Sequence, residues 1–265
     1  MPILMAVVLA SSVCAVADEE GHSKILADAL EKRYETETLQ RMTLVVKGPS
    51  GNLRERKLEL ATKLVEDRLY VLGKFTEPPR MRGTAFLAIE SKQSSSYFVY
   101  LPAFRKVRRI SNFQRSDPWF ETDLSFEDVE RHYYSDYRVL SVSRGMIAGE
   151  GVKIIRTTPT YNSRFAEVHF FIATTDLAML RLEYYVAGRA NPSKSIDAPR
   201  EFMIENDGSI LPKRITAKNH DNVTETQVVV GEVIFEPNLT KRFFSTATLE
   251  IRNKLPFVAA GTSNE

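Results

Sequence analysis

Short segments in which apolar and polar side chains alternate recur along most of this chain. In one of them, Val168 and Phe170 alternate with Glu167 and His169. Because successive side chains of a β-strand point to opposite faces, this period of two predicts a strand with one buried face. Clusters rich in Gly, Pro, Asn and Asp separate the segments and predict turns. The chain is therefore expected to form mainly antiparallel β-structure.

The full pattern predicts an α+β fold in which strands greatly outnumber helices. No low-complexity linker divides the chain and no internal repeat is visible, so a single domain is expected over residues 18–265. A sheet that alternates this regularly has one face that other elements must cover. Strands are predicted over 42–47, 58–64, 68–75, 84–90, 97–101, 137–143, 151–157, 165–173, 179–186, 201–205, 214–219 and 223–235.

Helical spacing is confined to three stretches. Residues 23–40 carry apolar side chains three and four positions apart, and Ser23 is a suitable N-cap. Residues 125–134 begin with a serine, and Asp128 follows three positions later, as in a capping box. A turn of helix is expected over 238–243. These helices are the candidates to cover the sheet.

The first 17 residues carry no charged side chain and are mostly apolar. This run is too short for a membrane-spanning helix, which needs about 20 apolar residues. It ends in small residues at Ala15 and Ala17, which predicts a signal peptide (residues 1–17) that is cleaved after Ala17. A buried N-terminal segment is the alternative. Lipidation of Cys14 is disfavoured, because Val13 stands where a lipoprotein signal requires a small residue.

Charge and motifs exclude several function classes. The net charge is only +2, from 36 basic and 34 acidic residues, which does not favour nucleic acid as a partner. No phosphate-binding loop or nucleophile elbow is present. Asp128 and His132 lie four positions apart and could share a metal, but a tetrahedral site needs more protein ligands. We therefore expect no enzyme activity, no metal and no cofactor.

One continuous arrangement resembles a known family. It contains RGTAFL at 82–87, YLPAFRKVRRIS at 100–111 and DLSFED at 123–128. These strings resemble the outer-membrane lipoprotein-sorting proteins, which have a LolA-like fold. The resemblance is clearest from Arg80 to Tyr134 and continues more loosely to 238–249.

The resemblance implies a fold and a function. The implied fold is a curved, incomplete antiparallel barrel of about ten or eleven strands, with a few helices on its concave face. The implied function is non-catalytic: a periplasmic carrier that holds the acyl chains of lipids or lipoproteins in a cavity between sheet and helices. An inner-membrane transporter of the resistance-nodulation-division type is the implied partner, and no stable membrane insertion is expected.

Apolar residues near the quoted strings, together with two residues from later strands, are the candidates to line such a cavity. Residues 125–134 could act as its mobile lid. As ordinary core residues, the same side chains would need no further explanation. The candidates are Phe86, Tyr100, Trp119, Phe120, Phe126, Val129, Phe170 and Leu182.

The basic run at residues 105–109 has two interpretations. On an extended strand its side chains alternate between faces, so they form one surface only if the strand lies at an edge. It could be a solvated edge strand whose charges oppose aggregation. It could instead contact anionic lipid headgroups or a membrane partner. The candidate contact residues are Arg105, Lys106, Arg108 and Arg109.

Two other functions remain open at this point. An envelope sensor would use a similar sheet to form a stable complex with one membrane partner. A purely structural domain would have a filled core and no cavity.

Overall fold

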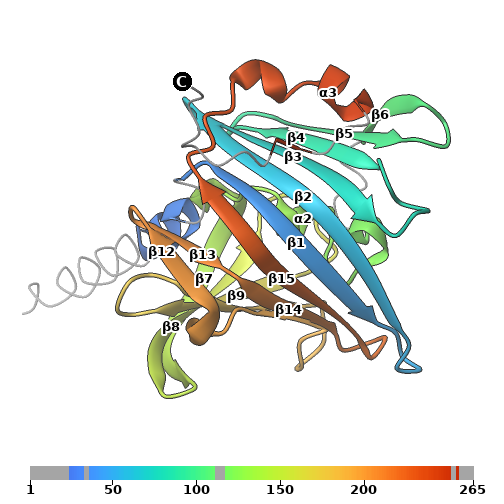
Figure 1. Cartoon of the computed structure of the whole chain (residues 1–265). Helices are drawn as coiled ribbons and strands as arrows, with labels where there is room; N and C mark the ends of the chain where they lie inside the picture. The colour runs from blue at the N-terminus through green and yellow to red at the C-terminus, as the bar shows by residue number, and fades with distance from the viewer. Residues whose placement is uncertain (1–23, 33–35, 111–116, 252–254, 257–265) are drawn as a thin grey trace, which may run out of the picture.

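The computed structural model of this 265-residue chain describes residues 24–32, 36–110, 117–251 and 255–256. Its main feature is one 13-stranded sheet, in which every neighbouring pair is antiparallel. The strand order is β6-β5-β4-β3-β2-β1-β15-β14-β11-β10-β9-β8-β7. Strands β6 and β7 are the two edges, so the sheet curves without closing (Figure 1). The predicted incomplete antiparallel barrel is confirmed.

The strand bounds follow the predicted segments closely. The count is higher than expected because β6, β11 and β13 are too short to give a clear alternation. The strands of the main sheet are β1 (Thr38–Lys47), β2 (Leu53–Val65), β3 (Arg68–Glu77), β4 (Ala85–Glu90), β5 (Ser95–Leu101), β6 (Lys106–Ile110), β7 (Tyr137–Ile147), β8 (Glu150–Pro159), β9 (Glu167–Ala173), β10 (Met179–Tyr185), β11 (Lys194–Asp197), β14 (Arg214–Asn219) and β15 (Thr224–Phe235). A separate hairpin consists of β12 (Met203–Asn206) and β13 (Ser209–Pro212).

The described helices are short. One helix covers residues 24–32, and its continuation to Gln40 was a wrong prediction, because β1 begins at Thr38 and pairs with both β2 and β15. The predicted helix over 125–134 is only one turn long. The remaining elements are η2 (Trp119–Glu121), α2 (Phe126–Val129), η3 (Tyr134–Asp136), η4 (Arg200–Phe202), η5 (Lys241–Phe243) and α3 (Thr246–Glu250).

Alternation along each strand gives the sheet two buried faces. On β3, Leu69 and Val71 point to the concave face, where they join the main core with the helix 24–32. The intervening Tyr70 and Leu72 point to the outer face. The C-terminal segment with α3 covers that outer face over β4–β6, whereas α2 lies inside the curve of the sheet (Figure 1). The concave face is therefore where the sheet and α2 enclose space.

Two findings concern the membrane and the chain's first segment. Within the described ranges, no helix is both long and apolar enough to cross a membrane. The predicted signal peptide, its cleavage after Ala17 and the question of Cys14 lipidation lie outside the described residues.

Candidate functional site

An apolar cavity of about 170 Å³ lies on the concave face of the sheet. Its floor consists of β1–β5 and β15, and residues 119–129 cover it from the inside of the curve. The alternation of these strands is what directs one row of aliphatic side chains into the space. The apolar lining includes Met42, Leu44, Leu58, Leu60, Leu69, Val71, Phe86, Val99, Trp119, Leu124, Phe126, Val129, Ile215, Val228 and Val230.

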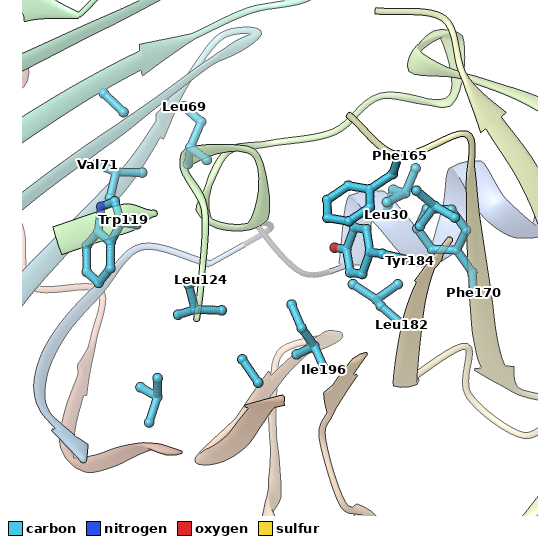
Figure 2. Close-up of a cluster of buried hydrophobic side chains, with 14 of the residues drawn as sticks. Leu30, Leu69, Val71, Trp119, Leu124, Phe165, Phe170, Leu182, Tyr184 and Ile196 are labelled. Carbon is cyan, nitrogen blue, oxygen red and sulfur yellow. The ribbon is translucent and has the colours of Figure 1, made fainter. Parts of the chain in front are cut away.

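A second cavity of about 80 Å³ lies on the other side of α2. It is enclosed by the helix 24–32, β10, β11 and the β12–β13 hairpin, with Leu182 and Ile196 in its wall. Leu124 and Val129 line both cavities. Figure 2 shows Leu124 between Trp119 and Val71 on one side and Leu182 and Ile196 on the other. A thin wall of side chains thus separates two apolar spaces.

Aromatic rings close one end of the first cavity. The rings of Phe86 and Trp119 meet edge to face, with centroids 5.3 Å apart. Phe75 and Phe120 meet in the same way at 4.8 Å. Gly73 makes this packing possible, because a Cβ at that position would lie only 2.2 Å from the Phe86 ring. Such aromatic pairs contribute about 0.5–1.5 kcal/mol each beyond the area they bury.

Arg56 holds the turn that carries these rings. Its side chain is 1% exposed, and its guanidinium donates hydrogen bonds to the Phe120 carbonyl oxygen and, at 3.0 Å, to Glu121 Oε2. Burial lowers the pKa of Arg56. Phe120 has φ of 47°, a left-handed conformation that is uncommon for residues other than glycine. The guanidinium therefore stabilises a strained turn against β2.

Charged side chains fix α2 on the other side. The Asp128 carboxylate accepts hydrogen bonds from the Ser125 backbone and hydroxyl, the latter at 2.7 Å, so the predicted capping box is confirmed. The same carboxylate pairs with Lys194 of β11. Glu127 is 1% exposed, and burial together with the Asp128 charge raises its pKa to about 7. A single helical turn thus carries two adjacent buried acids, and one of them pairs with a buried cation on β11.

The structure places six of the eight predicted lining residues in or beside a cavity wall. Phe86, Trp119, Phe126 and Val129 line the first cavity, and Val129 and Leu182 line the second. Phe120 packs against the Phe75, Phe86 and Trp119 rings without facing the space.

Two predicted lining residues lie elsewhere. Phe170 is 1% exposed and packs edge to face on Tyr137 at 4.9 Å, inside the solid core. Tyr100 is on the outer face, in the cluster that the C-terminal segment covers. Its placement follows from β5, where Tyr97 and Val99 already point to the concave face.

The basic run lies on an edge strand, as one of its two interpretations requires. Strand β6 pairs only with β5, and Arg105, Lys106, Arg108 and Arg109 are all exposed. Arg109 donates a 3.0 Å hydrogen bond to Ser96, and Arg108 lies 5.4 Å from the centre of the Phe104 ring. These four cationic side chains do not line the cavity and face solvent.

The Asp128 and His132 side chains do not converge on a common point. Asp128 faces Lys194, whereas the His132 ring contacts the Glu127 carbonyl oxygen and stacks on Tyr161 at 5.9 Å. Within the described ranges, no group of three or more His, Cys, Asp or Glu side chains is placed to hold a metal ion.

Sequence reasoning missed three polar residues that this site uses: Arg56, Lys194 and Gln40. Gln40 lines the first cavity and shares the inward register of Met42 and Leu44. The alternation of β1 predicts this position, but the helix predicted over 23–40 covers Gln40 and hides the pattern. Lys194 lies in a turn-rich stretch, and its partner is 66 positions away in the sequence.

Comparison with known proteins then places the chain. A family model described as "Uncharacterized protein" matches residues 68–251. The chain belongs to that family. No curated protein sequence matches it.

Solved structures of related shape show which fold the family has. A domain from Vibrio parahaemolyticus, described as an outer membrane lipoprotein-sorting protein, has a TM-score of 0.81 at 20% identity, over 88% of this chain and 100% of that one. A DUF1329 family protein from Desulfovibrio piger has a TM-score of 0.79 at 19% identity, over 87% and 98%. A LolA superfamily protein from Nitrosomonas europaea has a TM-score of 0.67 at 16% identity, over 86% and 98%. The LolA-like fold that the sequence predicts is confirmed.

Proposed function

We propose that this protein is a non-catalytic carrier that binds the acyl chains of lipids or lipoproteins between its sheet and α2 and moves them through the periplasm. The observation that carries this proposal is the apolar cavity on the concave face, closed by one helical turn. The LolA-like fold supports it, because one structure of this shape is described as a lipoprotein-sorting domain.

The size of the cavity suggests how binding would proceed. At about 170 Å³ it is comparable to cavities of about 150 Å³ that hold one benzene molecule. Each buried methylene contributes about 0.8 kcal/mol, so affinity grows with the length of chain admitted. A long acyl chain would need the second cavity as well, which requires Leu124 and Val129 to move apart from the sheet. Loading is therefore coupled to displacement of α2.

The exposed basic strand is the proposed contact with the membrane or with a transporter. Strand β6 and Arg105 just before it offer four cations, and β6 has an unpaired edge within the part of the chain that the structure describes. Anionic headgroups attract each nearby Lys or Arg by about 1 kcal/mol. A transporter of the resistance-nodulation-division type remains the proposed membrane partner.

The same edge favours one alternative function, an envelope sensor. Such a protein would form a stable complex with a single membrane protein through β6, whereas a carrier would bind its partner transiently. Co-purification from envelope extract distinguishes them: a fixed stoichiometric complex supports the sensor, and substoichiometric capture supports the carrier.

The direct test uses Trp119, the only tryptophan of the chain, which lines the cavity. Its fluorescence is measured while the purified protein is titrated with dispersed acylated lipid. We expect saturable quenching or a spectral shift in the wild type, and none in Phe126→Glu, which places a carboxylate in the cavity wall. Met146→Glu is the matched control, because Met146 is 72% exposed and lies on β7, away from the cavity and from the basic run. Equal binding by wild type and Phe126→Glu would contradict the proposed site.

Native mass spectrometry of protein purified from envelope extract gives an independent result. Added masses that resolve into phospholipid or acylated peptide would support the carrier and identify its cargo class. A bare protein mass that stays unchanged after incubation with lipid would contradict it.

A further inference from the structure

One end of the first cavity is polar rather than apolar. Five side chains with neutral hydrogen-bonding groups gather there, in a group that we call the polar collar. They come from the start of β1 and the segment just before it, the facing part of β2 and the β13 strand of the small hairpin. The collar consists of Thr36, Thr38, Gln40, Thr62 and Ser209, all of which line the cavity.

Strand register places the collar at one end. Thr38 of β1 pairs with Thr62 of β2, and Gln40 follows two positions later on the same face. Beyond Gln40, that face of β1 continues with Met42 and Leu44. Strand β2 shows the same change, from Thr62 to Leu60 and Leu58. The cavity therefore runs from a polar end to an apolar end that the aromatic rings close.

Hydrogen bonds within the collar engage one N–H of the Gln40 amide. The hydroxyls of Thr38 and Thr62 are 2.7 Å apart, and Gln40 Nε2 donates to Thr38 Oγ1 at 2.8 Å. Thr36 donates to the Ser209 hydroxyl at 2.7 Å. Gln40 is 4% exposed, and its amide donates one hydrogen bond, to Thr38, within the described residues. A side-chain amide has two donor hydrogens and an acceptor oxygen, so Gln40 has a further N–H that it can offer to a ligand in the cavity.

The charges of the residues that line the cavity disfavour an anionic ligand. Among the described residues that line this cavity, Glu90 is the one charged side chain, and no cation is present. A carboxylate or phosphate entering the collar would lose its hydration without gaining a counter-charge, which is costly. An ester carbonyl loses far less and can accept a hydrogen bond from the further Gln40 N–H.

We infer that the polar collar binds the uncharged ester group that heads an acyl chain, with Gln40 as the donor, while the chain extends toward Trp119. This inference rests on the proposed carrier function and specifies its ligand class: neutral acyl esters in preference to free fatty acids. Gln40 is a specificity-determining residue in this arrangement, since it recognises the ester group of the ligand by a hydrogen bond and does not sense the length of the chain.

The test compares three ligands with similar tails by Trp119 fluorescence at pH 8: methyl oleate, ionised oleate and 1-octadecene. We expect the wild type to bind methyl oleate about tenfold more tightly than either of the other two. The variant Gln40→Met keeps the length of the side chain and removes the amide. Its affinity for methyl oleate should fall to its affinity for 1-octadecene. Gln227→Leu is the control, because Gln227 alternates with the inward-facing Thr226 and Val228 and does not line the cavity.

Infrared spectroscopy of methyl oleate labelled with ¹³C at the carbonyl gives a second readout. A hydrogen bond from Gln40 lowers the carbonyl stretching frequency in the wild-type complex and not in the Gln40→Met complex. If all three ligands bind equally, or if Gln40→Met weakens all three alike, the collar inference is overturned and the carrier stands. If the wild type binds none of them, the carrier proposal itself fails.

Discussion

The ammonium group of Lys194 on β11 contacts the carboxylate of Asp128 on α2, and these side chains are only 2% and 0% exposed. Lys194 Nζ also lies 4.6 Å from the centre of the Tyr184 ring and 3.2 Å from the Ser125 hydroxyl. One buried ion pair thus joins α2, which covers the first cavity, to strand β11. On the other side, Arg56 joins the turn 119–121 to strand β2.

Removing one member of this pair should be strongly destabilising. Lys194→Met leaves Asp128 charged and buried without a counter-ion, and breaking a buried pair in this way costs about 3–5 kcal/mol. Urea denaturation measures the change in the free energy of unfolding. Lys218→Met, at an exposed position on β14, is the matched control and should change it by less than about 0.5 kcal/mol. A similar small change for Lys194→Met would mean that the pair does not hold α2.

The pH dependence of stability should report on Glu127. Burial and the neighbouring Asp128 raise the pKa of Glu127 from its ordinary value of 4.5 to about 7, while the Lys194 charge opposes the rise. The folded state then binds this proton more tightly than the unfolded state. Its contribution is therefore fully present below about pH 4.5 and is lost as the pH rises to about 7.

The variant Glu127→Gln isolates that effect. Relative to wild type, its stability should rise between pH 5 and 8 by up to about 3 kcal/mol, the free energy of the shift. Thermal or urea unfolding across that pH range gives the difference curve. Glu205→Gln, at an exposed position on β12, is the control and should change the stability by less than about 0.5 kcal/mol across this range. A flat curve for Glu127→Gln would mean that Glu127 is charged at neutral pH in the folded protein.

Arg56 should control access to Trp119. Its guanidinium holds the Phe120 carbonyl, so Arg56→Met should loosen the turn 119–121 and cost about 1–3 kcal/mol of stability. Acrylamide quenching of the single tryptophan measures access directly, and we expect faster quenching in this variant. Arg54→Met is the matched control, because Arg54 is 42% exposed and only 3.7 Å from the same Glu121. Equal quenching in both variants would contradict the role of Arg56.

The alternation of apolar and polar residues predicted most of the sheet, because it shows within each strand which side chains point inward and which point outward. Leu182, which alternates with Arg181 and Glu183, lies on the face that this rule predicts. The same rule could have excluded Tyr100, which is three positions from the inward-facing Tyr97 and so cannot share its face. The alternation of β5 alone is therefore enough to exclude Tyr100 from the concave face.

Other parts of the site depend on contacts that are distant in sequence. The sequence predicts that residues 38–40 end a helix, yet they form a strand because β15 pairs with them almost 200 positions later. Lys194 and Asp128 meet only after both halves of the sheet are in place. Whether Phe170 lines a cavity or fills the core depends on how closely neighbouring side chains pack, which alternation does not encode.

Leu124 offers the sharpest test that the two cavities can act as one. It is 4% exposed and lines both of them, so Leu124→Ala should join the spaces at a cost of about 2–5 kcal/mol in stability. Binding of a long acyl chain should then improve relative to a short one, because each further buried methylene adds about 0.8 kcal/mol. Titrations with C8 and C16 methyl esters measure that ratio. Leu239→Ala, in the outer-face cluster, removes a comparable side chain without touching either cavity and should leave the ratio unchanged. If Leu124→Ala behaves in the same way, the wall at Leu124 does not limit the length of the ligand.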